Sequence, residues 1–184
     1  MKALGTDYEN AKASTGDFTR LPAGGYVAKI TEVVDTPDGD KPYLTVTYDI
    51  AEGQYKDYYA DEWGKEHPYA HQFRQYYSTK ALGAFKGFLF AVDKSNGTDF
   101  VTEAKTGLNE QKLVGKQVGL VIAYKERMTD RGEVREVSYV DKYRSVEAIH
   151  EGRFKVPELR KLAPTASTPP AGFENIAPDD LPFF

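Results

Sequence analysis

The segment from Lys116 to Met128 constrains the fold more than any other, because its residues alternate between two faces of an extended strand. One face carries Val118, Leu120, Ile122 and Tyr124, and the other carries Gly119, Val121, Ala123, Lys125 and Arg127. Thr129–Gly132 has turn chemistry, and Glu133–Tyr143 reads as the returning strand. Its imperfect alternation indicates a bulge. Residues 116–143 therefore predict a β-hairpin.

The preceding sequence predicts three more strands and a helix. We expect strands at Tyr26–Val34 and Tyr43–Ile50, and a short third strand near Gln54–Ala60. Ser78 can cap a helix in which Leu82, Phe85, Leu89 and Val92 recur at steps of three and four, ended by Ser95-Asn96-Gly97. Ser145–His150 predicts a helical turn. The predicted class is mainly β with one principal helix, an OB-fold-like five-stranded barrel in the order β-β-β-α-β-β.

Composition divides the chain into three parts. Residues 1–20 are polar and are predicted to be a flexible N-terminal segment, and residues 21–162 are predicted to form one domain. Residues 163–184 form a Pro-rich linker and an acidic, aromatic tip. The sequence contains no run of about 18 apolar residues, so it predicts no membrane span. We expect a cytoplasmic protein and no membrane partner.

The charge distribution suggests a polyanionic partner although the net charge is −4. Residues 1–73 hold 7 Lys and Arg against 13 Asp and Glu, whereas residues 74–161 hold 17 against 12. Residues 162–184 hold none against 3, so an acidic tail follows a basic half. The absence of cysteine excludes disulfides, thiolate catalysis and cysteine metal sites.

The sequence contains clusters of aromatic and cationic residues, the two kinds of side chain that bind a single nucleic-acid strand. Stacking on bases requires exposed rings, and phosphates require cations. The candidate DNA-binding residues are Tyr43, Lys56, Tyr58, Tyr59, Trp63, Arg74, Tyr76, Tyr77, Lys125, Arg127, Arg131 and Arg135. Each tyrosine could instead fill a half-buried position of a sheet.

The last six residues, Asp179, Asp180, Leu181, Pro182, Phe183 and Phe184, place an acidic pair before an apolar tip. This end resembles the C-terminus of bacterial and phage single-stranded DNA-binding proteins, which closes on Asp-Asp-Ile-Pro-Phe. The resemblance implies that these six residues bind replication or recombination proteins. Phe184 departs from the pattern, because the terminal carboxylate of that family belongs to the Phe that follows Pro.

The body resembles a family of small phage proteins found among replication and recombination genes. The matching motifs are Leu-Pro-Ala-Gly-x-Tyr at Leu21–Tyr26, Lys-Ala-Leu-x-x-x-Lys-Gly at Lys80–Gly87 and Leu-Val-Gly-Lys at Leu113–Lys116. The resemblance covers roughly residues 18–162 and implies a protein that coats single-stranded DNA during phage replication or recombination. It leaves open whether the chain forms homo-oligomers.

Other readings of the sequence remain open. The body could serve a recombination mediator or a protein–protein adaptor that carries the same tail. Asp57, Asp61 and Glu62 could belong to a small metal-dependent nuclease, and His67 and His71 have the i, i+4 spacing of metal ligands. Solvated loop charges explain the carboxylates better, and the histidines have no third ligand at a clear spacing. We therefore expect no enzymatic activity, no metal and no cofactor.

Overall fold

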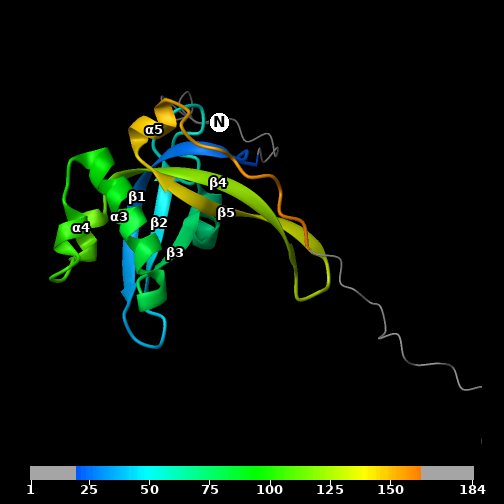
Figure 1. Cartoon of the computed structure of the whole chain (residues 1–184). Helices are drawn as coiled ribbons and strands as arrows, with labels where there is room; N and C mark the ends of the chain where they lie inside the picture. Colours follow the sequence, from blue (N-terminus) through cyan, green and yellow to red (C-terminus); the bar gives the residue numbers. More distant parts are fainter. Residues whose placement is uncertain (1–19, 163–184) are drawn as a thin grey trace, which may run out of the picture.

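A computed structural model describes residues 20–162 of the chain, apart from the side chains of Glu62 and Trp63. The predicted tip and linker lie outside the described residues, as does the predicted N-terminal segment except Arg20. The strands are β1 (Gly24–Thr36), β2 (Tyr43–Ile50), β3 (Gln72–Tyr76), β4 (Gln117–Met128) and β5 (Val134–Arg144). The principal helix is α3 (Leu82–Asn96), as Figure 1 shows. Shorter helical turns are α2 (Glu62–Glu66), η1 (Pro68–His71), η2 (Thr79–Ala81), α4 (Phe100–Glu103), η3 (Glu110–Leu113) and α5 (Val146–His150). No helix in this part of the chain is long and apolar enough to cross a membrane.

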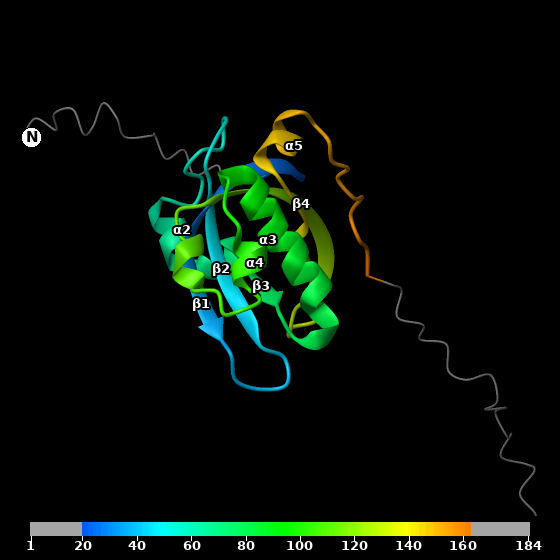
Figure 2. The same cartoon turned by 60° about the vertical axis from the view of Figure 1, so that its left-hand side comes forward.

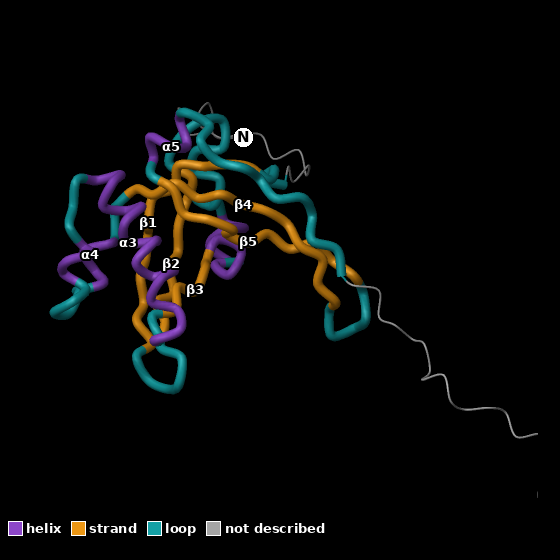
Figure 3. The backbone as a smooth tube through the Cα atoms, in the orientation of Figure 1, coloured by secondary structure: helices purple, strands orange, loops and turns teal. Residues whose placement is uncertain are grey.

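The five strands form one antiparallel, open sheet in the order β3-β2-β1-β4-β5 (Figure 3). β1 joins the β2–β3 half of the sheet to the β4–β5 half, since its residues 28–36 pair with β2 while residues 24–29 pair with β4. The predicted class of mainly β with one main helix is confirmed. The bulge expected in the returning strand is also confirmed, because Val121 pairs with Lys142 but Ile122 pairs with Val140, which leaves Asp141 as the extra residue.

The position of the third strand was predicted wrongly. Residues 54–59 form turns, and Asp57 adopts a left-handed conformation with φ 57°. Two backbone donors hold this loop against β2: the Asp57 amide donates to the Ile50 carbonyl, and the Tyr59 amide donates to Asp49 Oδ1. The tyrosines that suggested a strand, Tyr55, Tyr58 and Tyr59, pack against the core from this loop. The third strand is Gln72–Tyr76.

The start of the principal helix also differs from the prediction. Ser78 makes no side-chain capping bond, and the 3₁₀ turn Thr79–Ala81 precedes α3. The expected end is confirmed, since Gly97 is left-handed with φ 66° and its amide donates to the Asp93 carbonyl at 2.8 Å. The buried face of α3 carries Phe88, Leu89, Ala91 and Val92.

Aromatic side chains connect the two ends of the open sheet. Phe73 on β3 and Tyr143 on β5 have ring centroids 5.3 Å apart, and Phe88 of α3 lies 5.7 Å and 5.1 Å from them. Phe88 is fully buried. The sheet is therefore curled so that β3 and β5 approach each other, and ring packing against α3 fills the space between them.

A thin outer layer covers β1 and β4 on the side away from the main core. It consists of α5 and the segment Gly152–Leu162, which we call the strap (Figure 2). Gly119 and Gly25 permit this approach: a Cβ at Gly119 would lie 2.5 Å from Ile149, and one at Gly25 would lie 2.4 Å from the Phe154 ring. The strap then forms a parallel bridge between Arg160 and Lys125 of β4.

Candidate nucleic-acid interface

The β4–β5 hairpin projects from the body as a ribbon, which we call the arm and define as residues 124–138 (Figure 1). β1 pairs with β4 only up to Ile122, so beyond that point β4 keeps β5 and the strap as its backbone partners. The turn closes where the Thr129 amide donates to the Glu133 carbonyl, with Gly132 left-handed at φ 79°. The strap therefore holds the base of the arm, while the turn at its tip is exposed to solvent.

The register of the arm places its cations on one face. Lys125 pairs with Val137 and Arg127 pairs with Arg135, so these side chains lie together, and Tyr124 and Glu136 belong to the opposite face. Like charges that face each other across a ladder are unfavourable, and only Arg135 of this pair has a carboxylate partner in the described part of the chain, Glu133 at 2.8 Å. An anion placed between Arg127 and Arg135 would relieve this repulsion.

A groove of about 710 Å³ lies at the base of the arm, and we call it the arm groove. Five of its lining residues were predicted to bind DNA: Tyr58, Tyr59, Lys125, Arg127 and Arg135. Four more cationic or aromatic residues line it that the sequence analysis missed: Arg20, Tyr69, Tyr124 and Tyr139. Tyrosines from four separate segments therefore line one hollow, and Lys125, Arg127 and Arg135 reach its edge from the face of the arm opposite Tyr124.

Tyr59 forms part of the floor of the arm groove and has no free ring face to offer. It is 7 % exposed, stacks on His71 with centroids 4.6 Å apart and meets Tyr48 edge-on at 6.0 Å. Burial raises its pKa well above the usual value for tyrosine. Tyr58 packs edge-on against Tyr59 at 4.8 Å and is half-buried, and burial raises its pKa as well. The prediction that Tyr59 stacks on a base does not fit this burial.

His71 supports that floor as a neutral ring. It is 8 % exposed, and its Nδ1 has no hydrogen-bond partner within residues 20–162. Burial lowers its pKa, an effect that the nearby carboxylate of Asp49 partly opposes. His67 lies at the other end of η1, edge-on to Tyr69 at 5.7 Å. Both histidines of the hypothetical metal pair thus contact tyrosine rings.

Tyr69 is the most exposed large hydrophobic or aromatic side chain among the described residues, at 71 %, and it lies on the rim of the arm groove. Tyr124 faces the groove from β4, and its hydroxyl donates to the Leu21 carbonyl. The Arg20 guanidinium lies 3.5 Å from the Tyr124 ring centroid and pairs with Glu136 at 2.7 Å. A largely exposed ring and a guanidinium placed over a second ring therefore flank the same hollow.

Three other predicted residues form a separate patch on the outer face of β2 and β3. Tyr43 pairs with Tyr76 in the ladder, and their ring centroids lie 5.3 Å apart. The Arg74 guanidinium lies 4.8 Å from the Tyr43 ring centroid. This outer patch does not line the arm groove, yet it repeats the same pairing of rings with a cation.

The remaining predicted residues whose side chains are described, Tyr77, Lys56 and Arg131, lie in neither place. Tyr77 lies on the side of α3, where its hydroxyl donates to Asp35 Oδ1 at 2.7 Å; burial and this carboxylate raise its pKa to about 12. Lys56 is exposed in the loop after β2, and Arg131 is exposed in the turn at the tip of the arm. The side chain of Trp63 and residues 179–184 lie outside the described part of the chain.

Two of the three carboxylates weighed for a nuclease are described, and both belong to local turns, whereas the side chain of Glu62 lies outside the described part. Asp61 Oδ1 accepts from the Gly64 amide at 2.8 Å at the start of α2, and Asp57 occupies the left-handed turn described above. Over residues 20–162, no three His, Asp or Glu side chains are grouped as ligands for a metal ion.

The sequence held some signal for the missed residues. Tyr69 sits between the two histidines, and a search for exposed rings as well as ligands would have found it. Arg20 and Tyr124 could not be paired in advance, because 104 positions (124 − 20) separate them and only the fold joins them. A scan against protein-family models gives no match for this chain, and a search of the curated proteins finds no relative. The case for its function therefore rests on the geometry of the arm groove and the outer patch.

Proposed function

We propose that this protein binds single-stranded DNA with the arm groove and recruits replication or recombination proteins through its C-terminal tip. The observation that carries the proposal is the direct pairing of Arg127 with Arg135 beside a hollow lined with tyrosines. Phosphates neutralise such an arginine pair, and bases stack on tyrosine rings. A single strand offers both groups along one path.

The strand pairing supports the same proposal. In an OB-fold, a five-stranded, partly open barrel binds oligonucleotides across its strand 2–3 face and between two of its loops. Here β1 pairs with both β2 and β4, and the ring cluster of Phe73, Phe88 and Tyr143 draws the two sheet ends together. We infer an OB-like body in which the outer patch lies on the strand 2–3 face and the arm is an enlarged loop between β4 and β5.

Each group has a distinct part in the proposed complex. Tyr69 offers a free ring face for one base, and Tyr43 with Tyr76 offers a second platform. Stacking contributes about 1–3 kcal/mol per base. Arg127, Arg135 and Lys125 take phosphates, while Tyr59 and His71 shape the floor without touching the strand.

Salt dependence tests this proposal most sharply. Affinity for fluorescent oligo-dT should fall as salt rises, with a log–log slope of about −0.7 per phosphate neutralised. The double variant Arg127→Gln with Arg135→Gln should make the slope shallower by up to about 1.4 if each arginine meets one phosphate. The matched control is Lys86→Gln with Lys105→Gln, which removes the same charge from a hollow between α3 and α4.

The same titration separates the alternative functions. If the wild type shows no salt-dependent binding, or if both double variants change the slope equally, the arm groove is not the site. Duplex competitor that displaces oligo-dT at equal concentration would argue against a preference for single strands. Binding of a partner protein without any affinity for oligo-dT would favour the adaptor hypothesis, and cleavage of oligo-dT on addition of Mg²⁺ would favour a nuclease.

A further inference from the structure

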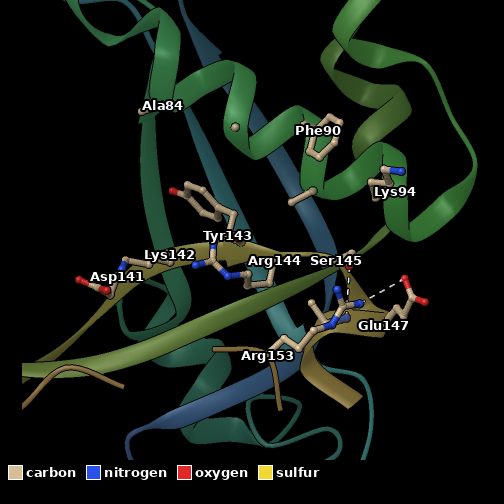
Figure 4. Close-up of a pocket in the computed structure, with 13 residues that line it drawn as sticks. Ala84, Phe90, Lys94, Asp141, Lys142, Tyr143, Arg144, Ser145, Glu147 and Arg153 are labelled. Atoms are coloured by element: carbon tan, nitrogen blue, oxygen red, sulfur yellow. Dashed lines mark hydrogen bonds and ion pairs between the residues drawn. The ribbon is translucent and has the colours of Figure 1, made fainter. Parts of the chain in front are cut away.

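A second hollow, of about 620 Å³, lies between α3, β5 and α5, apart from the arm groove. We call it the helix groove; Ala84, Gly87, Phe90, Lys142, Arg144 and Arg153 line it (Figure 4). Phe90 is 56 % exposed although it lies two residues after the fully buried Phe88. A large ring left open beside a hollow indicates a surface that another group covers.

Part of the helix side of the helix groove consists of small residues, which leaves the floor low there. A Cβ added at Gly87 would meet no atom within 4 Å, and Ala84 and Ala91 extend the same strip of α3. Tyr143 closes the bottom from β5, where its ring contacts Phe88 at 5.1 Å. The hollow therefore combines an apolar floor with the open edge of the Phe90 ring.

The rim of the helix groove is cationic. Lys94, Lys142, Arg144 and Arg153 line it, and the two acidic residues on the rim have cationic partners. Asp141 pairs with Arg160 of the strap at 3.4 Å, and Glu147 pairs with Arg153 at 3.6 Å, the contact dashed in Figure 4. Lys142 has no acidic partner among the described residues, and the Arg144 guanidinium donates to a carbonyl, that of Tyr143. The groove therefore suits a ligand that carries both carboxylates and apolar rings.

We propose that the helix groove is a docking site for the acidic C-terminal tip of the same chain, residues 179–184. The tip carries two aspartates, the terminal carboxylate and two phenylalanine rings, which match the cationic rim and the apolar floor. The proposal concerns a surface other than the one proposed for DNA, and it holds or fails independently of that function.

The chain is long enough for this contact. Arg153 lines the groove and Leu162 is nine residues later, so at most about 32 Å of extended chain separates them. The 17 residues from Leu162 to Asp179 can span up to about 60 Å. A tether of this length keeps the tip at an effective concentration on the order of millimolar, so a weak site suffices. A contact within one chain is therefore favoured over one with a second copy.

The experiment uses the full chain and the absence of native cysteine. A spin label at Ala177→Cys should broaden the amide NMR signals of Gly87, Lys94 and Arg144 relative to those of Lys125 and Arg127. Lys142→Glu should restore the broadened signals, whereas the matched control Lys105→Glu, an exposed lysine outside the helix groove, should leave them broadened. Changing Phe183 and Phe184 to Ser should restore them without altering the body, which keeps the test valid if Lys142→Glu disturbs folding.

Three results would overturn the proposal. Uniform broadening or none would show that the tip has no site on the body. Broadening centred on Lys125 and Arg127 would place the tip in the arm groove. In a mixture, spin-labelled chains at natural isotope abundance can be added to isotope-enriched chains that carry no spin label. Broadening of the signals of the isotope-enriched chains would then show that the tip binds a second copy.

Discussion

The two halves of β4 have the same alternating pattern but meet different surroundings. From Val118 to Ala123 both faces are buried, one by the main core and the other by α5 and the strap. From Lys125 to Met128 three of the four residues are exposed, and their partners on β5 are exposed or half-buried. One half of the strand thus stabilises the fold, while the other presents charges to solvent.

This difference shows where the chain can change without unfolding. Substitutions in the buried half remove packing or collide with a neighbouring layer, so their cost appears as lost stability. Substitutions in the arm remove few contacts within the protein, so their cost should appear in binding. The following variants should lose either unfolding free energy or affinity for DNA, according to their place in the fold. The largest expected effect comes first.

Phe88→Ala should have the largest effect, because it empties the space between the ends of the sheet. The ring is fully buried against Phe73 and Tyr143, and such truncations cost about 3–5 kcal/mol of unfolding free energy. Denaturant titration measures this change. Phe90→Ala on the same helix is the control, with an expected change within about 0.5 kcal/mol. Equal losses for the two variants would show that the ring cluster does not hold the sheet ends together.

Tyr69→Ala should weaken oligo-dT binding by about 1–3 kcal/mol and leave the denaturation midpoint unchanged. The ring is mostly exposed on the rim of the arm groove, so little packing is lost with it. Tyr69→Phe is the control and should bind as the wild type, because it keeps the stacking surface. A loss of stability in Tyr69→Ala without a loss of affinity would assign this ring to the fold instead.

Arg20→Gln should produce a smaller change, mainly in binding. It removes a cation over Tyr124 and an exposed ion pair with Glu136, and such pairs contribute about 0.2–1 kcal/mol to stability. Arg20→Lys keeps the charge but loses the planar contact with the ring. Affinity that falls for Gln and recovers for Lys would assign charge as the role of Arg20, whereas equal loss in both would assign ring stacking.

The smallest expected effect concerns pH and His71. Burial lowers its folded pKa below the usual 6.5, so the unfolded chain takes up the proton first as the pH falls. Its contribution to stability is therefore complete above about pH 6.5 and is lost as the pH falls through the folded pKa. His71→Gln should reduce the difference in unfolding free energy between about pH 8 and about pH 5. An unchanged difference would show that other groups cause the pH dependence.

Alternation and turn chemistry predicted much of the sheet. β2 begins and ends at the predicted residues, and residues 116–143 predicted the arm, its turn and a bulge in the returning strand, which the structure places at Asp141. The third strand failed because Tyr55, Tyr58 and Tyr59 mimic strand composition while they pack from a loop. Periodicity could not distinguish the two cases, since an aromatic side chain suits a strand and the underside of a loop equally well.

The candidate site was predicted less completely than the sheet. The sequence indicated that rings and cations matter, and it named five residues that line the arm groove. It could not separate these from the outer patch of Tyr43, Arg74 and Tyr76, nor exclude Tyr77, because register and sheet order set those distances. The sequence also indicated Tyr59 as a DNA-binding residue, but its ring is buried in the floor of the arm groove.

The sequence by itself determined most of the local elements, though not the third strand, because side-chain periodicity and turn residues act over a few neighbouring positions. It also determined the basic second half and the acidic tip, which are properties of composition. Only the tertiary structure decided that α5 and the strap cover half of β4, and that Arg20, Tyr69 and Tyr124 meet beside the arm. These contacts join residues far apart in the chain, so they depend on how the curled sheet, whose ends meet at Phe73, Phe88 and Tyr143, packs with the segments around it.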